Sequence, residues 1–224
     1  LGALTEEILA ESGALDAIEL DRDLPPILRT KFFRYGDDFR IFEADAMKFD
    51  YADLAKDGRQ LRVVGNLPYN ISTQLIFHLL SHADVIMDMH FMLQKEVVDR
   101  LAAKPGENHY GRLGIMAQYY CQVESLFDVP PECFSPRPKV MSAIVRLTPH
   151  RELPIVADNV DTLQRVLREA FNQRRKTLRN TLKALLTSEE ITEAGVDGSL
   201  RPEQLDLAAF VRLADKLADK PVVA

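Results

Sequence analysis

The sequence predicts an α/β protein whose sheet is of the nucleotide-binding type, followed by a small all-helical region. Short apolar or β-branched runs alternate with helical periodicity through the first two thirds of the chain. Acidic residues follow successive strand-like runs, at the carboxyl ends where α/β sheets bind their ligands. From Pro149 onward only helical periodicity remains. We therefore expect one domain over residues 1–148 and a second over 149–224.

The composition is that of a protein with a full apolar core and no membrane segment. Hydrophobic residues make up 46% of the 224 residues, and no apolar run approaches the length of a membrane span. Cys121 and Cys133 fit neither a disulfide framework nor a metal-ligand spacing, and the five histidines show no ligand spacing either. Without a visible signal peptide, a cytoplasmic protein that binds no metal and no membrane is expected.

Positive charge is concentrated in one segment of an otherwise acidic chain. The net charge is −6, yet residues 165–183 hold seven cations and a single acid, Glu169. The seven are Arg165, Arg168, Arg174, Arg175, Lys176, Arg179 and Lys183. Such a cluster predicts contacts with nucleic-acid phosphates, although a solvated helix surface is the plain alternative.

The first residues have the pattern of a fold interior. The chain begins at Leu1 without methionine, and Leu4, Ile8 and Leu9 recur at helical spacing before Gly13, a plausible C′ residue. We expect that a segment which normally precedes this helix is missing.

Two strand-like runs then end in acids. ALDAIEL (residues 14–20) is followed, after a helix over 24–33, by FRIFE (residues 39–43). Glu19 stands where nucleotide-binding folds bind a ribose diol, and Asp45 where a short acceptor could bind an adenine amine. Acids at strand ends are common, so solvated carboxylates are the alternative for both.

The central stretch is LRVVGNLPYNIS, residues 61–72. A buried strand breaks at Gly65, and a helix over 73–80 follows the turn. Pro68 stiffens the turn and restricts Leu67 to extended backbone. Asn66 offers an amide oxygen, Leu67 a carbonyl and Tyr69 a flat ring. Together they suit an aromatic base with an exocyclic amine, although a plain strand and turn would have the same pattern.

The next elements are a strand over 85–93, a helix over 96–103, a polar loop over 104–112 that contains Arg112, and a helix over 113–121. Two antiparallel edge strands, 123–129 and 142–147, flank a loop with four prolines in nine residues. Phe134 in that loop could form a second wall of a base pocket, or could fill the edge of the core.

The predicted C-terminal region contains four helices, over residues 160–171, 174–186, 189–194 and 207–217. Leu178, Leu182 and Leu185 form an apolar stripe that would pack the second of these helices against the domain.

Several of these stretches together resemble the ribosomal RNA adenine dimethyltransferases. They are IELDRDL (18–24), DAM (45–47), GNLPYNIS (65–72), FMLQKEV (91–97), YGRLG (110–114), PRPKV (136–140) and AFNQRRKTLRN (170–180). The last, with MAQYYC (116–121), is most similar to the bacterial small-subunit enzyme. The resemblance runs the whole length of the chain.

The resemblance implies a Rossmann-like S-adenosylmethionine-dependent methyltransferase sheet and gives each candidate residue a role. Catalytic roles fall to Asn66, Leu67 and Pro68 in the turn, with Tyr69 and Phe134 enclosing the flipped base. Cofactor contacts fall to Gly2, Glu19, Asp45, Ala46 and Asn66. RNA contacts fall to Arg112, Arg174, Arg175, Lys176 and Arg179.

The implied activity is N6-dimethylation of adenosines in small-subunit ribosomal RNA by a monomer acting on the immature small subunit. A nicotinamide-dependent dehydrogenase would also place Glu19 on a ribose, but it leaves NLPY and the basic segment unexplained. A DNA adenine methyltransferase shares the pocket chemistry. The serious alternative is an assembly factor that binds RNA with this fold and does not methylate.

The front of the chain departs from the family. LGALTE is the tail of the family's glycine loop, of which only Gly2 remains. We therefore expect the chain as written to bind S-adenosylmethionine poorly and to methylate little, while keeping much of its RNA affinity.

Overall fold

The computed structural model describes residues 2–68, 70–173 and 175–220. It divides into two compact units, of which unit 1 is Leu1–Leu61 with Ile71–Val85 and unit 2 is Arg62–Asn70 with Ile86–Ala224. The division between a sheet domain and a helical domain near residue 148 stays a prediction. None of the helices in the described ranges is long and apolar enough to cross a bilayer.

Unit 1 contains a two-stranded parallel sheet and several helices. Its elements are α1 (Ala3–Ser12), β1 (Leu15–Glu19), α2 (Leu24–Lys31), η1 (Phe33–Asp38), β2 (Phe39–Glu43), η2 (Tyr51–Ala55) and α3 (Ser72–Leu80). As expected, α1 ends at Gly13, which has φ 76° and donates its N–H to the carbonyl of Leu9. Leu9, Leu28, Phe32 and Phe39 form the buried core of α1, α2 and β2.

Unit 2 is built on a four-stranded sheet in the order β3-β4-β6-β5. Its strands are β3 (Leu61–Asn66, all but its first residue), β4 (Ile86–Gln94), β5 (Cys121–Val129) and β6 (Ser142–Pro149). The expected antiparallel pair 123–129 and 142–147 is confirmed, but β6 is not an edge strand: it pairs with β4 on one side and β5 on the other.

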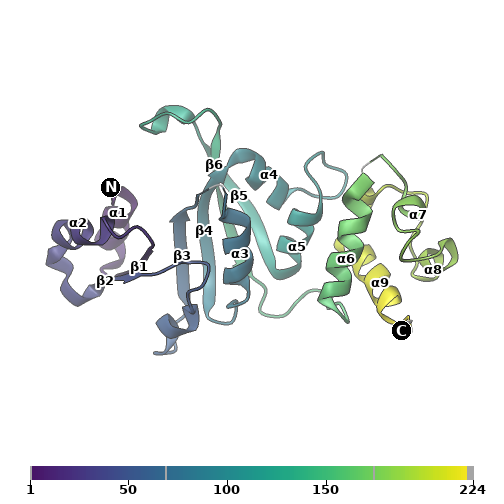
Figure 1. Ribbon diagram of the computed structural model, residues 1–224, viewed down its shortest axis with the longest axis horizontal. Helices are drawn as coiled ribbons and strands as arrows, with labels where there is room; N and C mark the ends of the chain where they lie inside the picture. Colours follow the sequence, from purple (N-terminus) through teal and green to yellow (C-terminus); the bar gives the residue numbers. More distant parts are fainter. Residues whose placement is uncertain (1, 69, 174, 221–224) are drawn as a thin grey trace. The chain divides into compact units, whose positions relative to one another are not determined.

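Helices cover this sheet and continue into the C-terminal region. They are α4 (Lys95–Ala102), α5 (Arg112–Tyr120), η3 (Pro131–Cys133), α6 (Val160–Ala170), η4 (Phe171–Gln173), α7 (Leu178–Thr181), α8 (Ser188–Glu193), η5 (Pro202–Gln204) and α9 (Leu207–Ala218). Figure 1 shows α4 and α5 against the sheet and α6 beside α9. The buried Tyr110 hydroxyl donates to the carbonyl of Leu205 at 2.7 Å and so ties the loop before α5 to the C-terminal helices.

One expected helix is wrong in extent. Residues 174–186 do not form a single helix, because α7 covers only Leu178–Thr181. The N–H groups of Leu178 and Arg179 donate instead to the carbonyls of Leu200 and Gly198. The apolar stripe itself is confirmed, since Leu178, Leu182 and Leu185 are all buried.

Candidate active site and RNA-binding surface

The carboxyl ends of β1 and β2 bring Glu19 and Asp45 to one edge of the parallel sheet in unit 1. Glu19 pairs with Glu43 in the register, and the N–H of Ala44 donates to the Glu19 carbonyl at 3.0 Å. Each acid also shapes its own turn: a Glu19 oxygen accepts from the N–H of Asp21, and an Asp45 oxygen accepts from that of Met47. The second oxygen of Asp45 lies 3.9 Å from Nζ of the exposed Lys48. Carboxylate oxygens suit the hydroxyl and amine donors of an adenosine.

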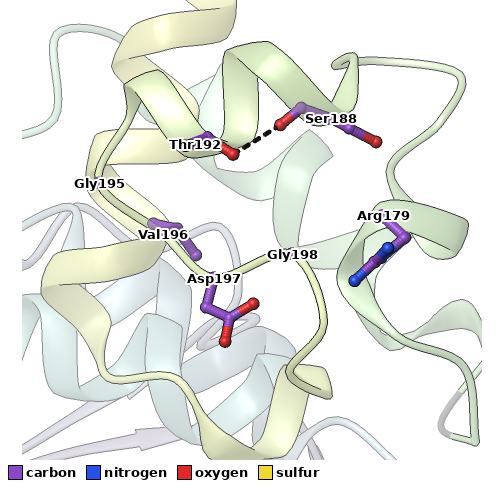
Figure 2. A pocket seen from close by; sticks show the side chains of 7 residues that line it. All are labelled: Arg179, Ser188, Thr192, Gly195, Val196, Asp197 and Gly198. Carbon is purple, nitrogen blue, oxygen red and sulfur yellow. Dashed lines mark hydrogen bonds between the residues drawn. The ribbon is translucent and has the colours of Figure 1, made fainter.

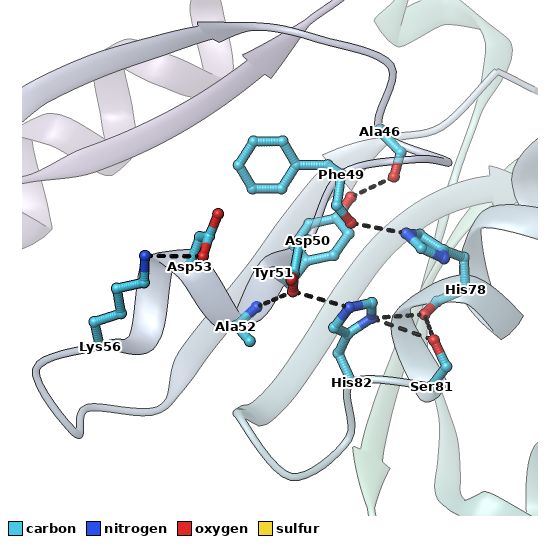
Figure 3. A network of polar contacts seen from close by, with 10 residues as sticks. All are labelled: Ala46, Phe49, Asp50, Tyr51, Ala52, Asp53, Lys56, His78, Ser81 and His82. Atoms are coloured by element: carbon cyan, nitrogen blue, oxygen red, sulfur yellow. Dashed lines mark hydrogen bonds and ion pairs between the residues drawn. The ribbon is translucent and has the colours of Figure 1, made fainter.

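The segment after Asp45 is held by an aromatic cluster, shown in Figure 3. The Tyr51 hydroxyl donates to the carbonyl of Ala46 at 2.9 Å, and the Tyr51 ring packs against the rings of His78 on α3 and of His82 in the turn after that helix. Burial, together with the charge of Asp45, raises the pKa of Tyr51 to about 12, so the phenol keeps the proton it donates. His78 Nε2 donates to the carbonyl of Phe49 at 2.9 Å. These two hydrogen bonds therefore restrain the backbone carbonyls of Ala46 and Phe49, in the segment directly after Asp45.

Gly2 starts α1 in a conformation that favours glycine. Its φ is 73°, and a Cβ there would lie 3.0 Å from both Leu28 and Phe32. The position allows close packing of α1 on α2. Gly2, Glu19, Asp45 and Ala46 thus all lie in unit 1, and their donor and acceptor set is compatible with a nucleoside cofactor.

In unit 2, β3 ends at Asn66, and the turn after it is shaped by Gly65. Leu67 is buried, its N–H donates to the carbonyl of Met92 on β4 at 3.3 Å, and its side chain folds back over Gly65. A Cβ on Gly65 would lie 3.0 Å from Leu67 Cδ2, so glycine leaves the space that this side chain uses. Asn66 and Pro68 remain exposed at the end of the strand, while Tyr69 lies outside the described residues.

Phe134 lies in a loop that leaves the sheet at the same end as Asn66. The loop between β5 and β6, residues 130–141, extends beyond the end of the sheet in Figure 1. The strand that follows the loop, β6, begins at Ser142, opposite Gln94 at the end of β4. Two residues before Gln94, the carbonyl of Met92 accepts the hydrogen bond from Leu67. Phe134 is half-buried on extended backbone directly after η3. Asn66 and the loop that carries Phe134 therefore lie at the same end of the sheet.

The cations predicted to contact RNA lie on exposed surface of unit 2. Arg112 is exposed in the first turn of α5, and Arg175, Lys176 and Arg179 are exposed between η4 and the end of α7. Arg174 lies outside the described residues. Figure 2 shows Arg179 beside a pocket of 490 Å³ formed by α8 and the turn at residues 195–198. Asp197 on its rim accepts from Ser199, and the hydrogen bonds to Ser199 lower the pKa of Asp197.

Residues outside the predicted set also shape the site. Tyr51 and His78 support Ala46, and Lys95 contacts two carboxylates at the start of α4. Only the Gln-Lys-Glu run after a strand could have indicated Lys95, because its partner Asp128 is 33 residues away.

Comparison with known proteins identifies the family of this chain. The family model for "Ribosomal RNA adenine dimethylase" matches residues 1–219. The proteins of Marinobacter nauticus and Pseudomonas putida named ribosomal RNA small subunit methyltransferase A are 64% and 65% identical over 219 residues. Each alignment covers 98% of this chain, with 79% and 82% of the relatives covered.

Solved structures agree with this fold. A dimethyladenosine transferase from Plasmodium falciparum superposes with a TM-score of 0.75 at 26% identity, covering 95% of this chain and 84% of that one. The 23S rRNA methyltransferase ErmE superposes with a TM-score of 0.73 over 97% and 87% of the two chains, and at 22% identity it shows the fold alone. The family predicted from the sequence motifs is confirmed: this chain belongs to the ribosomal RNA adenine dimethylases.

Proposed function

We propose that the protein transfers methyl groups from S-adenosylmethionine to N6 of adenosines in small-subunit ribosomal RNA, two to each target. The observation that carries the proposal is one end of the unit 2 sheet, where β3 ends at Asn66, Leu67 follows it, and the loop with Phe134 joins β5 to β6. Membership of the adenine dimethylase family supports the reaction class. The names of the similar bacterial proteins support the small-subunit substrate.

The unit 1 residues would hold the cofactor. Glu19 suits a ribose diol, because a carboxylate accepts from two hydroxyls at once. Asp45 and the backbone at Ala46 suit an adenine ring, with the backbone held by Tyr51. S-adenosylmethionine supplies an electrophilic sulfonium methyl group when bound. In this proposal the acids bind and orient, and no proton transfer is assigned to them.

The unit 2 residues would hold and activate the target amine. An adenine amine is a weak nucleophile because its lone pair is delocalised into the ring. The amide oxygen of Asn66 and the carbonyl of Leu67 would accept its two N–H groups and favour a pyramidal nitrogen with its lone pair directed outward. A neutral amide avoids burying an unpaired negative charge beside the base. Each transfer would exchange one N–H proton of the amine, released to solvent, for the methyl group, and the broken sulfonium–methyl bond would leave a neutral thioether. Catalysis then depends on positioning more than on a strong base.

Stacking would hold the base out of the RNA helix. A target inside a duplex must be extruded before its amine can reach the acceptors, and extruded bases are bound between aromatic side chains. Phe134, at this end of the sheet, would stack on one face of the extruded base. Tyr69 would stack on the other face in the proposal.

The proposal is tested by incorporation of labelled methyl groups into RNA by the protein expressed from its full reading frame. Substrates are transcribed small-subunit RNA, either free or assembled into particles, with duplex DNA as the control. Mass spectrometry of the digested RNA should detect N6,N6-dimethyladenosine. Tight binding to RNA particles without methyl incorporation would favour the assembly-factor alternative, and methylated DNA would contradict the substrate.

Removing exposed cations should weaken RNA binding through its electrostatic part. We expect the double variant Arg175→Ala, Lys176→Ala to reduce the slope of log K against log salt by about 1 to 2. Each phosphate contact releases counterions from the RNA, so a variant with fewer contacts releases fewer of them on binding. Filter binding from low to moderate salt measures the slope.

The matched control is Lys56→Ala, Arg59→Ala in unit 1. These two cations are also exposed, but each is paired with a nearby acid, Asp53 or Asp57. Their removal should leave the slope unchanged. Equal slopes in both double variants would place the RNA away from residues 175–176.

A further inference from the structure

Lys95 lies between two carboxylates at the point where β4 passes into α4. Its Nζ is 3.1 Å from an oxygen of Asp128 at the end of β5 and 3.1 Å from an oxygen of Asp99 one turn further along α4. The hydrogen bond to Asp128, and to a smaller extent the one to Asp99, raises the pKa of Lys95 above its ordinary value. Three side chains from β5 and α4 thus meet in one ion-paired cluster.

The backbone of Lys95 makes a further contact on the other side of the same hairpin. Its N–H donates to the carbonyl of Met141 at 2.9 Å. Asp128 lies just before the loop of residues 130–141, and Met141 is the last residue of that loop. The strand ladder ends with Val129 opposite Ser142. Lys95 therefore contacts the end of the strand that leads into the loop through its side chain, and the last residue of the loop through its backbone.

The loop has its own internal bracing. The N–H groups of Cys133 and Phe134 donate to the carbonyls of Pro130 and Pro131, and Arg137 pairs with Glu132 across the loop. Such a segment moves chiefly as one body about its base, because its own bonds and prolines restrict internal motion. The orientation of Phe134 then depends on how firmly the base is held.

We infer that Lys95 is a positioning residue, which holds the base of the 130–141 loop through Asp128 and Met141 and thereby sets the orientation of Phe134 toward the target base. The inference rests on the proposed function for the role of Phe134, but the holding of the loop is a separate, measurable property. Ion pairs as exposed as this one contribute little to global stability. Replacing the Lys95 side chain removes the contact with Asp128 and keeps the backbone bond to Met141, so it should loosen the loop without unfolding the protein.

Limited trypsin digestion measures the loop without any activity. The Lys139–Val140 bond lies in the loop, whereas the bond after Arg137 precedes proline and resists trypsin. Lys95→Met should raise the cleavage rate after Lys139 by about threefold to tenfold, because cleavage follows the population of the open form. Lys95→Arg should restore the slow rate, since arginine can bond both acids.

The matched control is Arg146→Met. Arg146 also forms a cross-strand ion pair, at 2.8 Å with Glu124, on the same β5–β6 hairpin but farther from the loop. Its loss should leave cleavage after Lys139 unchanged. Equal cleavage rates for Lys95→Met and the unsubstituted protein would overturn the inference, whether or not the protein methylates RNA.

Kinetics test the link to Phe134. Lys95→Met should lower kcat for RNA methylation by about tenfold, with a smaller change in KM, because a displaced stacking wall affects the reactive geometry more than overall RNA binding. In a Phe134→Ala background the same change should cost less than about twofold, since both act through one contact. If the reductions in kcat from the two single substitutions multiply in the double variant, Lys95 does not act through Phe134.

Discussion

Replacing Asn66 by alanine is expected to lower the single-turnover rate of RNA methylation by about 10²- to 10³-fold, the usual cost of removing one preorganised hydrogen bond to a transition state. Asn66 is exposed at the end of β3, while the adjacent Leu67 is buried and bonded to Met92. The truncation therefore removes an acceptor without disturbing the core. Unfolding free energy and RNA affinity should change little.

A glutamine on the same sheet provides the control. Gln122 is an exposed amide on β5, opposite Thr148 at the end of the hairpin remote from the loop. Gln122→Ala should methylate at the unsubstituted rate. If Asn66→Ala also keeps a near-normal rate with saturating RNA and cofactor, the amide has no part in the transition state.

Local pattern was sufficient for most strands and helices. The strand predicted for FRIFE forms β2 with the same bounds, residues 39–43, and Gly13 ends α1 through the left-handed conformation expected of a C′ glycine. These features are decided by neighbours in sequence, so their signals are local.

Long-range partners were not readable from the sequence. Residues 174–186 have a helical stripe, yet the N–H groups of Leu178 and Arg179 bond the turn at residues 198–200, so tertiary bonds override helix propensity. Likewise residues 142–147 were predicted as an edge strand, whereas pairing with both β4 and β5 makes β6 central.

The candidate site shows the same division. Glu19, Asp45 and Asn66 were identified because acids and amides at strand ends carry a local signal, and the structure places each at a carboxyl end. The contacts that support these residues have no such signal in the sequence. Neither the bond from Tyr51 to Ala46 nor the pairing of Lys95 with Asp128 follows from spacing.

The second large effect is expected at Gly114, where α5 passes close to α4. A Cβ on Gly114 would overlap the carbonyl oxygen of Arg100 and would lie 3.3 Å from that of Leu101. One turn later Gln118 donates to the carbonyls of Leu101 and Ala103 at 2.8 and 2.9 Å, so α5 also completes the hydrogen bonding at the end of α4. The added Cβ would collide with backbone atoms of α4, so no side-chain rotation can relieve the overlap.

Gly114→Ala should therefore reduce the free energy of unfolding by about 2–4 kcal/mol, because overpacking outweighs the roughly 1 kcal/mol that alanine gains in helix propensity. Chemical denaturation measures this. The control is Gly111→Ala: Gly111 has φ 177°, its Cβ would meet only Phe171 at 3.9 Å, and the expected cost is below about 1 kcal/mol. A Gly114→Ala protein within about 0.5 kcal/mol of the unsubstituted one would mean that α4 and α5 separate easily, and that Gln118 can be released from the end of α4 at little cost.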